Sequence, residues 1–436
     1  MLLAIDKLIY GGSGLARMPA DDKGPGKAVF LPFVLEGERV EAEIVEQKPG
    51  FARARATKIV EASPQRIAPP CPYFGECGGC HYQHTTYEHQ LQIKSAILRE
   101  TLRRVANIEF DGEIQVHAAH PWNYRNRTRM RLRTQPFLLG YSRMRWNDLL
   151  PVEECPISSP LINGAIGVLW DLGRANRVSA DITEVEFFAN AEDKQLLLEL
   201  TLKDASWRLR RKSDVLDFVR TLRAAMPEVA GVAVFHQDSG GWLEREHVPG
   251  ELQEIFGADH LRYSTPAGDY EVSAGSFFQI NRFLISTLLD LVTRGRSGHH
   301  TFDLYAGAGL FSLALAKAFS RVSAVESAPF PFHDLKRNCP SNVNCFREPV
   351  GRFLAGQRRA FDLAVVDPPR AGLGKKVAEL LAASGTPRIT YVSCDPATLA
   401  RDLTVLMESG YRIEELHLID LFPQTYHIES VLQIVR

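Results

Sequence analysis

The stretch FDLYAGAGLFSLALA, residues 302–316, decides the fold of the C-terminal part of the chain. It reads as a buried strand, a tight turn containing Gly307 and Gly309, and a helix. Such glycines let the backbone approach a ligand closely, and Glu326, at the end of the next strand-like run, is placed to bind ribose hydroxyls. Ser312 replaces the third glycine of a dinucleotide fingerprint. The pattern therefore favours a nucleoside ligand without a pyrophosphate, such as S-adenosyl-L-methionine (SAM), over NAD, with a purely structural turn as the alternative.

Short β-rich runs surround this stretch and mostly alternate with helical segments. They lie at residues 300–306, 321–327, 361–367, 388–393, 414–422 and 430–435. This rhythm predicts a doubly wound, mainly parallel sheet. Ligands bind such sheets at the carboxyl ends of the strands, so we expect functional residues there.

One of these runs ends in Asp367-Pro368-Pro369-Arg370. Prolines fix φ and stop the strand, so the acid is held rigidly at the ligand edge of the sheet. The segment can be read as a plain strand terminator. Its position after the glycine turn favours a contact with cofactor or substrate.

The next run, in TYVSCDPATLARDL (390–403), ends at Cys394. Asp395 is a natural N-cap and Pro396 suits the first helical position, so the thiol is expected beside a helix N-terminus. The partial positive charge there favours the thiolate. We interpret Cys394 as a nucleophile rather than an ordinary buried cysteine.

Glu429 stands just before the final strand, near Ile428 and Val431. Apolar surroundings would raise its pKa and suit it to act as a base, whereas a solvated loop carboxylate is the alternative. A thiolate and a base fit one reaction. Addition of the thiolate to carbon 6 of uracil makes carbon 5 nucleophilic enough to take the SAM methyl group, and the base then removes the hydrogen at carbon 5.

The N-terminal two thirds of the chain have a different organisation. The first sixty residues contain strand-like runs after a hairpin, which predict a five-stranded OB-type barrel. Residues 114–265 mix strands and helices as an α+β domain does, and a helix over 87–105 is expected to pack on the C-terminal domain. The predicted domains are residues 1–62, 63–265 and 266–436.

Four of the seven cysteines precede residue 339, at Cys71, Cys77, Cys80 and Cys155. Three clustered thiolates and a distant fourth suit either a tetrahedral zinc or an iron–sulfur cluster, and the spacing does not distinguish them. Cys339 and Cys345 have no partners in sequence and are interpreted as core or surface thiols.

The run WNYRNRTRMRLR (122–133) places arginines at alternate positions, hence on one face of a strand. No Asp or Glu occurs between residues 114 and 147. Arginines bind phosphates and aromatic rings stack on unpaired bases, so the segment predicts binding to structured RNA, with a solvated strand face as the alternative. The residues are Arg125, Arg127, Arg129, Arg131, Arg133, Arg143 and Arg145, with Trp122, Tyr124, Tyr141 and Trp146.

Composition narrows the class of protein to which the chain can belong. The 436 residues are 45% hydrophobic and 24% charged, with a net charge of −1, which argues against a uniformly basic nucleic-acid coat. The chain shows neither a basic leader nor an apolar run of membrane-spanning length. We therefore expect a cytoplasmic protein whose cysteines are reduced.

Together the motifs resemble the RNA (uracil-5-)-methyltransferase family, the TrmA/RumA class. The stretches that carry the resemblance are GSFFQIN, DLYAGAGLFSLALA, DPPRAG, VSCDPATLARDL and FPQTYHIES. The resemblance implies a C-terminal Rossmann-like SAM-dependent domain. It also implies that Cys394 is the nucleophile, that Glu429 is the base, and that SAM is contacted by Gln279, Tyr305, Gly307, Glu326 and Asp367.

The N-terminal module resembles a TRAM domain, an RNA-binding barrel. With the cysteines, this places the chain nearest the branch that carries a [4Fe-4S] cluster and forms 5-methyluridine in 23S ribosomal RNA, and implies Cys71, Cys77, Cys80 and Cys155 as cluster ligands. The target uridine of this protein is expected to be extruded from the RNA, because Cys394 must reach carbon 6. The alternatives are the same chemistry on transfer RNA, a non-catalytic RNA-binding or assembly factor, and an enzyme that methylates adenine amino groups.

Overall fold

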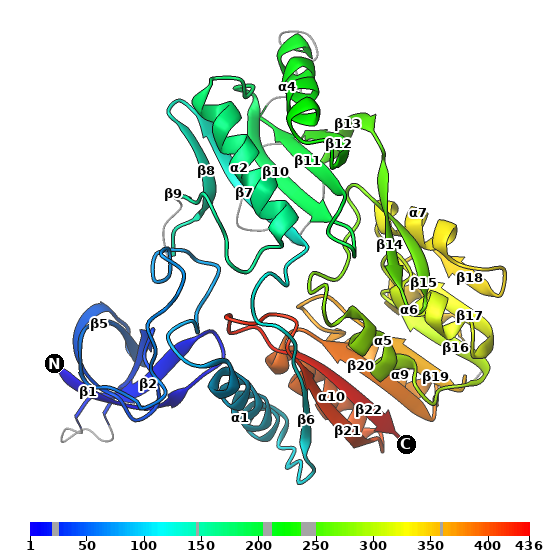
Figure 1. Ribbon diagram of the computed structural model, residues 1–436. Coiled ribbons are helices and arrows are strands. Elements are labelled where there is room, and N and C mark those ends of the chain that lie inside the picture. Colours follow the sequence, from blue (N-terminus) through cyan, green and yellow to red (C-terminus); the bar gives the residue numbers. More distant parts are fainter. Residues whose placement is uncertain (20–25, 145–147, 204–211, 237–249, 358–360) are drawn as a thin grey trace.

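The N-terminal strands close into a barrel in the order β1-β2-β3-β5-β4 (Figure 1). The structure is a computed structural model and describes residues 1–19, 26–144, 148–203, 212–236, 250–357 and 361–436. Buried and exposed residues alternate along the first strands, which lets one face of each fill the barrel interior. The predicted five-stranded barrel is confirmed, with strands β1 (Leu2–Leu8), β2 (Ser13–Arg17), β3 (Ala28–Pro32), β4 (Arg39–Gln47) and β5 (Phe51–Glu61).

A seven-stranded sheet forms the middle of the molecule, in the order β13-β12-β11-β10-β7-β8-β9. Helices α2 (Pro160–Arg174) and α4 (Lys212–Ala225) pack on it over an apolar core (Figure 1). Its strands are β7 (Arg127–Thr134), β8 (Phe137–Ser142), β9 (Leu149–Pro151), β10 (Ile182–Ala189), β11 (Leu196–Leu202), β12 (Val229–His236) and β13 (Glu251–Gly257).

The C-terminal sheet has the order β18-β17-β16-β19-β20-β22-β21-β6. Its first five strands are parallel, whereas β22 runs antiparallel to both neighbours. The strands are β6 (Ile114–His117), β16 (Gly298–Leu304), β17 (Phe319–Val325), β18 (Val343–Phe346), β19 (Leu363–Val366), β20 (Arg388–Ser393), β21 (Arg412–Ile419) and β22 (Glu429–Val435). The predicted mainly parallel sheet is confirmed.

Apolar cores lie on both faces of this sheet, as double winding requires. Side chains of α8, α9 and α10 belong to one core, and side chains of α5, α6 and α7 to the other. The helices are α5 (Ile285–Thr293), α6 (Leu310–Leu315), α7 (Pro329–Asn338), α8 (Val350–Ala355), α9 (Gly374–Ala383) and α10 (Pro396–Glu408).

Two segments of the predicted central domain belong to the C-terminal domain in the structure. Helix α1 (Tyr87–Ala106) packs against α10, as expected, and β6 pairs in parallel with β21. The hairpin of β14 (His260–Thr265) and β15 (Gly268–Ser273) crosses the predicted boundary at residue 265. The boundaries 1–62, 63–265 and 266–436 stay a prediction. Among the described helices, none is both long and apolar enough to span a membrane.

Candidate active site

One cavity of about 1930 Å³ is lined by residues of the seven-stranded sheet, the cysteine-rich segment and the strand ends of the C-terminal sheet. All eleven predicted site residues line it: Cys71, Cys77, Cys80, Cys155, Gln279, Tyr305, Gly307, Glu326, Asp367, Cys394 and Glu429. The fold thus brings together residues that are more than 350 positions apart in sequence. Their individual roles stay predictions.

Strand register aligns three of the predicted SAM contacts. Leu304 of β16 is paired with Val325 of β17 on one side and Val366 of β19 on the other. One step beyond these ends stand Tyr305, Glu326 and Asp367. The carboxyl ends of the three parallel strands therefore present one aromatic and two acidic residues side by side.

The glycine turn forms an open cradle beside this row. Gly307 has a φ of 55° and no atom within 4 Å of the position that a Cβ would occupy. Its amide donates to Glu326 Oε2 over 3.0 Å. Tyr305 has a φ of 66°, a left-handed conformation that is costly for a non-glycine residue and typical of functional sites. Space, a free backbone approach and a carboxylate are what a nucleoside ligand requires at this edge.

The GSFFQIN segment (275–281) connects the cavity to the loop before β22. Gln279 lines the cavity, while its carbonyl accepts from the Asn126 side chain. Asn281 is fully buried and its amide donates to the carbonyls of Asp420 and Leu421. Sequence reasoning gave Asn281 no role, because its partners lie about 140 residues away.

Cys394 sits where β20 ends and α10 begins. Asp395 is the N-cap, its Oδ1 accepting from the amides of Ala397 and Thr398 over 3.0 and 2.9 Å, and Pro396 opens the helix. This confirms the predicted cap. In the antiparallel β20–β22 ladder Ser393 pairs with Ser430, so the next step places Cys394 opposite Glu429.

Burial controls the ionisation of this pair. It raises the pKa of the Cys394 thiol to about 12, and the nearby carboxyls of Glu429 and Asp367 act in the same direction. The predicted preference for thiolate is therefore wrong for the resting site, because burial and two acids outweigh the helix terminus. Burial, and next the neighbouring Asp367, also raise the pKa of Glu429 well above its usual range, as expected. Burial raises the pKa of Asp367 to about 7.

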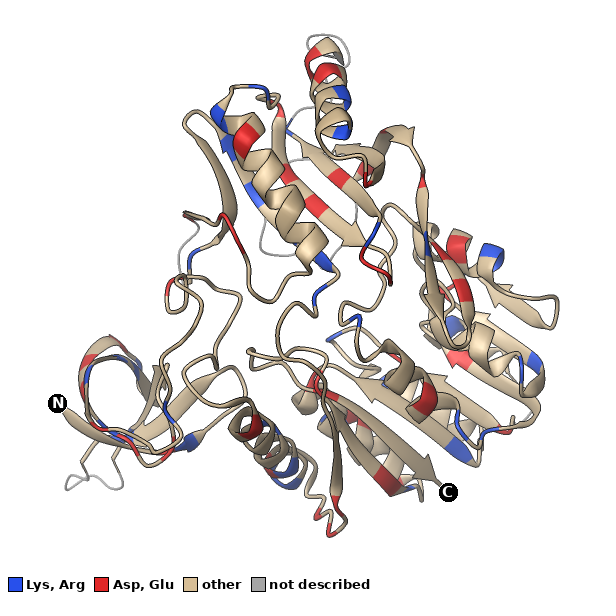
Figure 2. Cartoon of the chain, viewed as in Figure 1, with Lys and Arg blue, Asp and Glu red and all other residues tan. Residues whose placement is uncertain are grey.

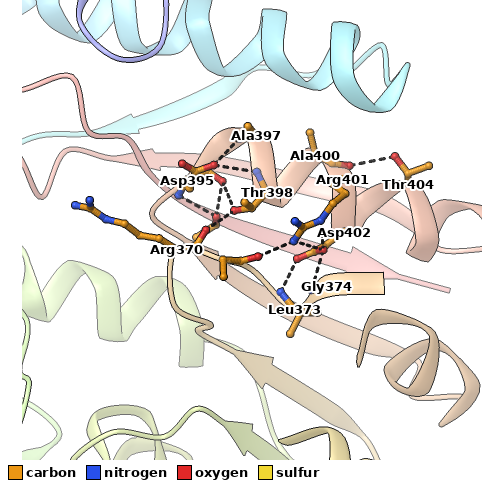
Figure 3. A network of polar contacts seen from close by, with 12 residues as sticks. Arg370, Leu373, Gly374, Asp395, Ala397, Thr398, Ala400, Arg401, Asp402 and Thr404 are labelled. Atoms are coloured by element: carbon orange, nitrogen blue, oxygen red, sulfur yellow. Dashed lines mark hydrogen bonds and ion pairs between the residues drawn. The ribbon is translucent and has the colours of Figure 1, made fainter. Parts of the chain in front are cut away.

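Arg370 is the cation that opposes these shifts, since its charge lowers the pKa of both Cys394 and Glu429. Its backbone is held, because Thr398 Oγ1 donates to the Arg370 carbonyl over 3.0 Å. In Figure 3 its side chain points away from the polar network that braces residues 370–374. Asp402 anchors that network by accepting from the amides of Leu373 and Gly374. The sequence predicted no role for Arg370, although it belongs to the Asp-Pro-Pro-Arg motif.

Helix α1 holds the loop that precedes Glu429. Lys94, fully buried, donates to Asp420 Oδ1 over 2.6 Å and to the Phe422 carbonyl over 2.9 Å. Gln90 and Gln424 exchange hydrogen bonds of 3.0 Å. A lysine on an amphipathic helix is normally taken as solvated, so the sequence carried no signal for this role.

The arginine-rich strand is largely neutralised within the protein. Arg127 is 7% exposed and pairs with Glu186 and Glu199, and Arg129 bonds to Glu186. Although burial opposes it, these arginines lower the pKa of Glu186 to about 2. Figure 2 shows acidic and basic positions side by side on this sheet. Arg127 is therefore paired within the protein, which corrects the prediction that it binds RNA. The cavity is lined by Arg127 together with Arg125, Arg129, Arg131, Arg133 and Arg143.

The aromatic residues near this strand also divide. Tyr124 is fully buried and its hydroxyl donates to the Pro423 carbonyl over 3.1 Å, so the prediction that it stacks on a base is wrong. Tyr141 lines the cavity and shares a hydrogen bond with Thr128. Arg145 and Trp146 lie outside the described residues.

The four early cysteines lie near one another on the cavity wall. The pKa of Cys80 is raised by burial and then by the neighbouring thiols of Cys155, Cys77 and Cys71. Burial raises the pKa of Cys77 to about 11, although the Gly79 amide donates to its sulfur over 3.4 Å. Within the described ranges, no three His, Cys, Asp or Glu side chains are arranged around a single metal position.

Comparison with known proteins decides the family. The family model described as tRNA (Uracil-5-)-methyltransferase matches residues 86–347 and 354–436. This chain belongs to that family. The TRAM domain model matches residues 2–57, the segment that folds as the barrel. The chain is therefore a member of the SAM-dependent RNA uracil-5-methyltransferase family with an N-terminal TRAM domain, as the motifs predicted.

Family members similar over their full length carry two kinds of name. An "Uncharacterized RNA methyltransferase" of Aquifex aeolicus is 33% identical and covers 98% of this chain and 97% of its own length. The protein named 23S rRNA (uracil(1939)-C(5))-methyltransferase RlmD of Klebsiella pneumoniae is 31% identical, covering 98% and 93%. The same-named protein of Alkalilimnicola ehrlichii is 30% identical, covering 100% and 96%.

A solved structure supports the fold. The Pyrococcus abyssi tRNA (uracil-54, C5)-methyltransferase in complex with S-adenosyl-L-homocysteine aligns with a TM-score of 0.76 over 100% of both chains, at 22% identity. At that identity the likeness concerns the arrangement of barrel, central sheet and methyltransferase domain.

Proposed function

We propose that this chain transfers a methyl group from SAM to carbon 5 of a uridine in 23S ribosomal RNA, through a covalent bond between Cys394 and carbon 6 of the base. The observation that carries the proposal is that Cys394 and Glu429 lie one step beyond the last pair of the β20–β22 ladder, Ser393 and Ser430, at the cavity that also contains the glycine cradle. A nucleophile and a base on one side of a pair of strands can act on adjacent carbons of one flat ring.

Two carboxyls handle the protons. Asp367, with a pKa of about 7, lies near enough to Cys394 to affect its ionisation and can accept the thiol proton as sulfur bonds to carbon 6. After methyl transfer, Glu429 removes the hydrogen from carbon 5, and the electron pair of that bond re-forms the double bond while sulfur leaves. Asp367 then returns the proton to the thiolate.

The cofactor site fits SAM. Bound SAM supplies an electrophilic methyl group. Tyr305, Gly307, Glu326, Asp367 and Gln279 would hold it: the cradle at Gly307 admits the ligand close to the backbone, and Glu326 offers a carboxylate to the ribose hydroxyls. Arg370 is the group that would stabilise negative charge as it develops on the uracil ring.

The relatives named for 23S ribosomal RNA, at 30–31% identity over the full length, support ribosomal RNA as the substrate, and the TRAM barrel supports RNA binding of either kind. Transfer RNA is the second candidate, because the aligned solved structure is named for it. Both would enter the cavity as an extruded uridine, the form in which carbon 6 is open to a nucleophile. We place the enzyme in the cytoplasm.

Cys71, Cys77, Cys80 and Cys155 would hold a [4Fe-4S] cluster. Four thiols line one cavity wall and act on one another electrostatically, and an amide donates to the sulfur of Cys77, which suits thiolate ligation. None of the steps assigned above to Cys394, Glu429 and Asp367 requires a cluster. We therefore propose a structural role for it.

A covalent trap tests the reaction. Cells expressing the protein are grown with 5-fluorouracil, RNA bound covalently to it is recovered, and the attachment site is sequenced. Fluorine cannot leave as a proton, so the reaction should stall as an adduct on Cys394, and Cys394→Ala should give none. Attachment to transfer RNA would replace the ribosomal substrate. Absence of any adduct from a protein that binds SAM and RNA would overturn the covalent mechanism.

A further inference from the structure

The tip of the first barrel hairpin reaches the candidate active site. Tyr10, in the turn between β1 and β2, donates its hydroxyl to the Cys394 carbonyl over 3.4 Å. The Asp395 carboxylate lies near enough to the same hydroxyl to raise its pKa, after burial. The two contacted residues are adjacent, and they form the whole connection between β20 and α10. A barrel side chain thus touches the backbone of the predicted nucleophile.

The same tyrosine contacts the loop that carries Glu429. The rings of Tyr10 and Tyr426 pack edge to face, with an angle of 89° between the ring planes and 5.5 Å between the ring centroids. Tyr426 is also packed against His81, at 4.6 Å, and His427, at 4.3 Å. Tyr10 is therefore wedged between the two segments that supply the nucleophile and the base.

Surrounding contacts fix the position of the hairpin tip. Leu8, just before the turn, is 5% exposed and belongs to the same apolar core as Leu399 of α10. On the other side, a Cβ at Gly12 would lie only 3.1 Å from the His81 ring. The turn is therefore in close contact with the residue that directly follows Cys80. His81 in turn donates its amide to the Gln424 carbonyl. The tyrosine is held on both sides of its turn.

We propose that Tyr10 is a positioning residue for Cys394. Its hydroxyl holds the Cys394–Asp395 connection in the conformation that keeps the thiol opposite Glu429, and its ring supports Tyr426. The Asp395 oxygen that caps α10 already accepts two amides, so the tyrosine adds a restraint from outside the methyltransferase domain. The barrel, beyond any contact with RNA, completes the active site. This inference rests on the proposed covalent mechanism.

Tyr10→Phe isolates the hydroxyl, because it keeps the ring against Tyr426. Tyr411→Phe is the matched control, since it removes a buried tyrosine hydroxyl that donates to a carbonyl, that of Thr386, at the other end of the strands. Two rates are measured on each folded protein. One is the single-turnover formation of adduct with RNA from 5-fluorouracil-grown cells that lack the protein. The other is alkylation of Cys394 by iodoacetamide without RNA, followed by peptide mass spectrometry.

We expect Tyr10→Phe to slow adduct formation at saturating RNA about threefold to tenfold, the range of one lost hydrogen bond. RNA and SAM affinities should stay within about twofold. Alkylation of Cys394 should become faster, because a looser connection exposes the thiol, while Cys339 and Cys345 react as before. Tyr411→Phe should alter neither rate.

Unchanged rates in Tyr10→Phe would overturn the proposal, as would a loss confined to RNA affinity, which would make the hydroxyl an RNA contact. Failure of the wild-type protein to form any adduct would instead sink the proposed function. The alkylation rate remains informative in that case, because it reports the hold of Tyr10 on Cys394 without RNA.

Discussion

Cys394 and Glu429 stand opposite each other one step beyond Ser393 and Ser430, the last pair of the β20–β22 ladder. Opposite residues in antiparallel strands project to the same side with their Cβ atoms about 5 Å apart. A flat ring entering the cavity can therefore meet a sulfur and a carboxyl from one edge. The antiparallel final strand is what makes this possible, because a parallel strand would bring its opposite end to this edge.

Replacement of the proposed base should stop the reaction after the covalent step. In Glu429→Gln the sulfur can still add to carbon 6, whereas the hydrogen at carbon 5 is no longer removed. We expect a protein–RNA complex that survives denaturing gels with ordinary RNA and SAM, and turnover reduced by about 10²-fold or more. Glu414→Gln, a surface change on β21, is the control. Normal turnover in Glu429→Gln would assign the base elsewhere.

Loss of Arg370 should move the pH dependence of the reaction. Its charge lowers the pKa of Cys394 and Glu429, so Arg370→Ala raises both and a higher pH is needed to ionise them. We expect the rising limb of the pH–rate profile to shift to higher pH and the rate at neutral pH to fall about tenfold. Arg352→Ala, at an exposed position on α8, should leave the profile in place. A uniform loss at every pH would mean that Arg370 acts in binding or in stabilising charge on the ring and does not set the ionisation of Cys394 and Glu429.

Asp303 should make the protein less stable as the pH rises through the range from about 4 to 7. Burial raises the pKa of Asp303 from 3.8 to about 7, so the folded state holds a proton that the unfolded state has released. The free energy of unfolding then falls by up to about 1.4 kcal/mol per pH unit in this window. Asp303→Asn should flatten the dependence in thermal melts.

The contrasting variant for that measurement is Asp269→Asn. Arg262 and Ser264 lower the pKa of the exposed Asp269, so its contribution has the opposite sign and is small. A wild-type stability that rises between pH 4 and 7, and responds equally to both substitutions, would contradict the role given to Asp303.

Breaking the buried Lys94–Asp420 pair should unfold or loosen the loop that carries Glu429. Lys94→Met leaves Asp420 buried without its cation, a change that costs about 3–5 kcal/mol. The double variant Lys94→Met/Asp420→Asn should recover part of this loss in denaturant unfolding, because no charge is then stranded. If the double variant lost as much stability as Lys94→Met and Asp420→Asn lose in sum, the pair would not act as a unit.

The cluster prediction is tested by metal content. Protein purified without oxygen should carry close to four irons and absorb broadly in the visible blue. Serine at Cys71, Cys77, Cys80 or Cys155 should lower the iron content, whereas Cys345→Ser should not. Zinc in place of iron, or iron that is indifferent to these four substitutions, would refute the proposed [4Fe-4S] site.

The sequence alone determined those features that depend on neighbours along the chain. Alternation predicted the barrel strands and the mainly parallel sheet, and the Asp395-Pro396 pair predicted where α10 begins. The glycine turn at Gly307 and the acid at Glu326 indicated the edge of the sheet at which a nucleoside would bind. Backbone propensity, caps and period set these features, and each is written within a few residues.

Only the tertiary structure decided the environments of the side chains. It buried Arg127 between two glutamates, enclosed Tyr124, and turned Lys94 into an internal anchor. It also raised the pKa of Cys394, against the expectation from its helix terminus, and brought Tyr10 of the barrel to that residue. Charge pairing and desolvation depend on which distant segments meet, and that is fixed by strand order and register, which no local pattern specifies.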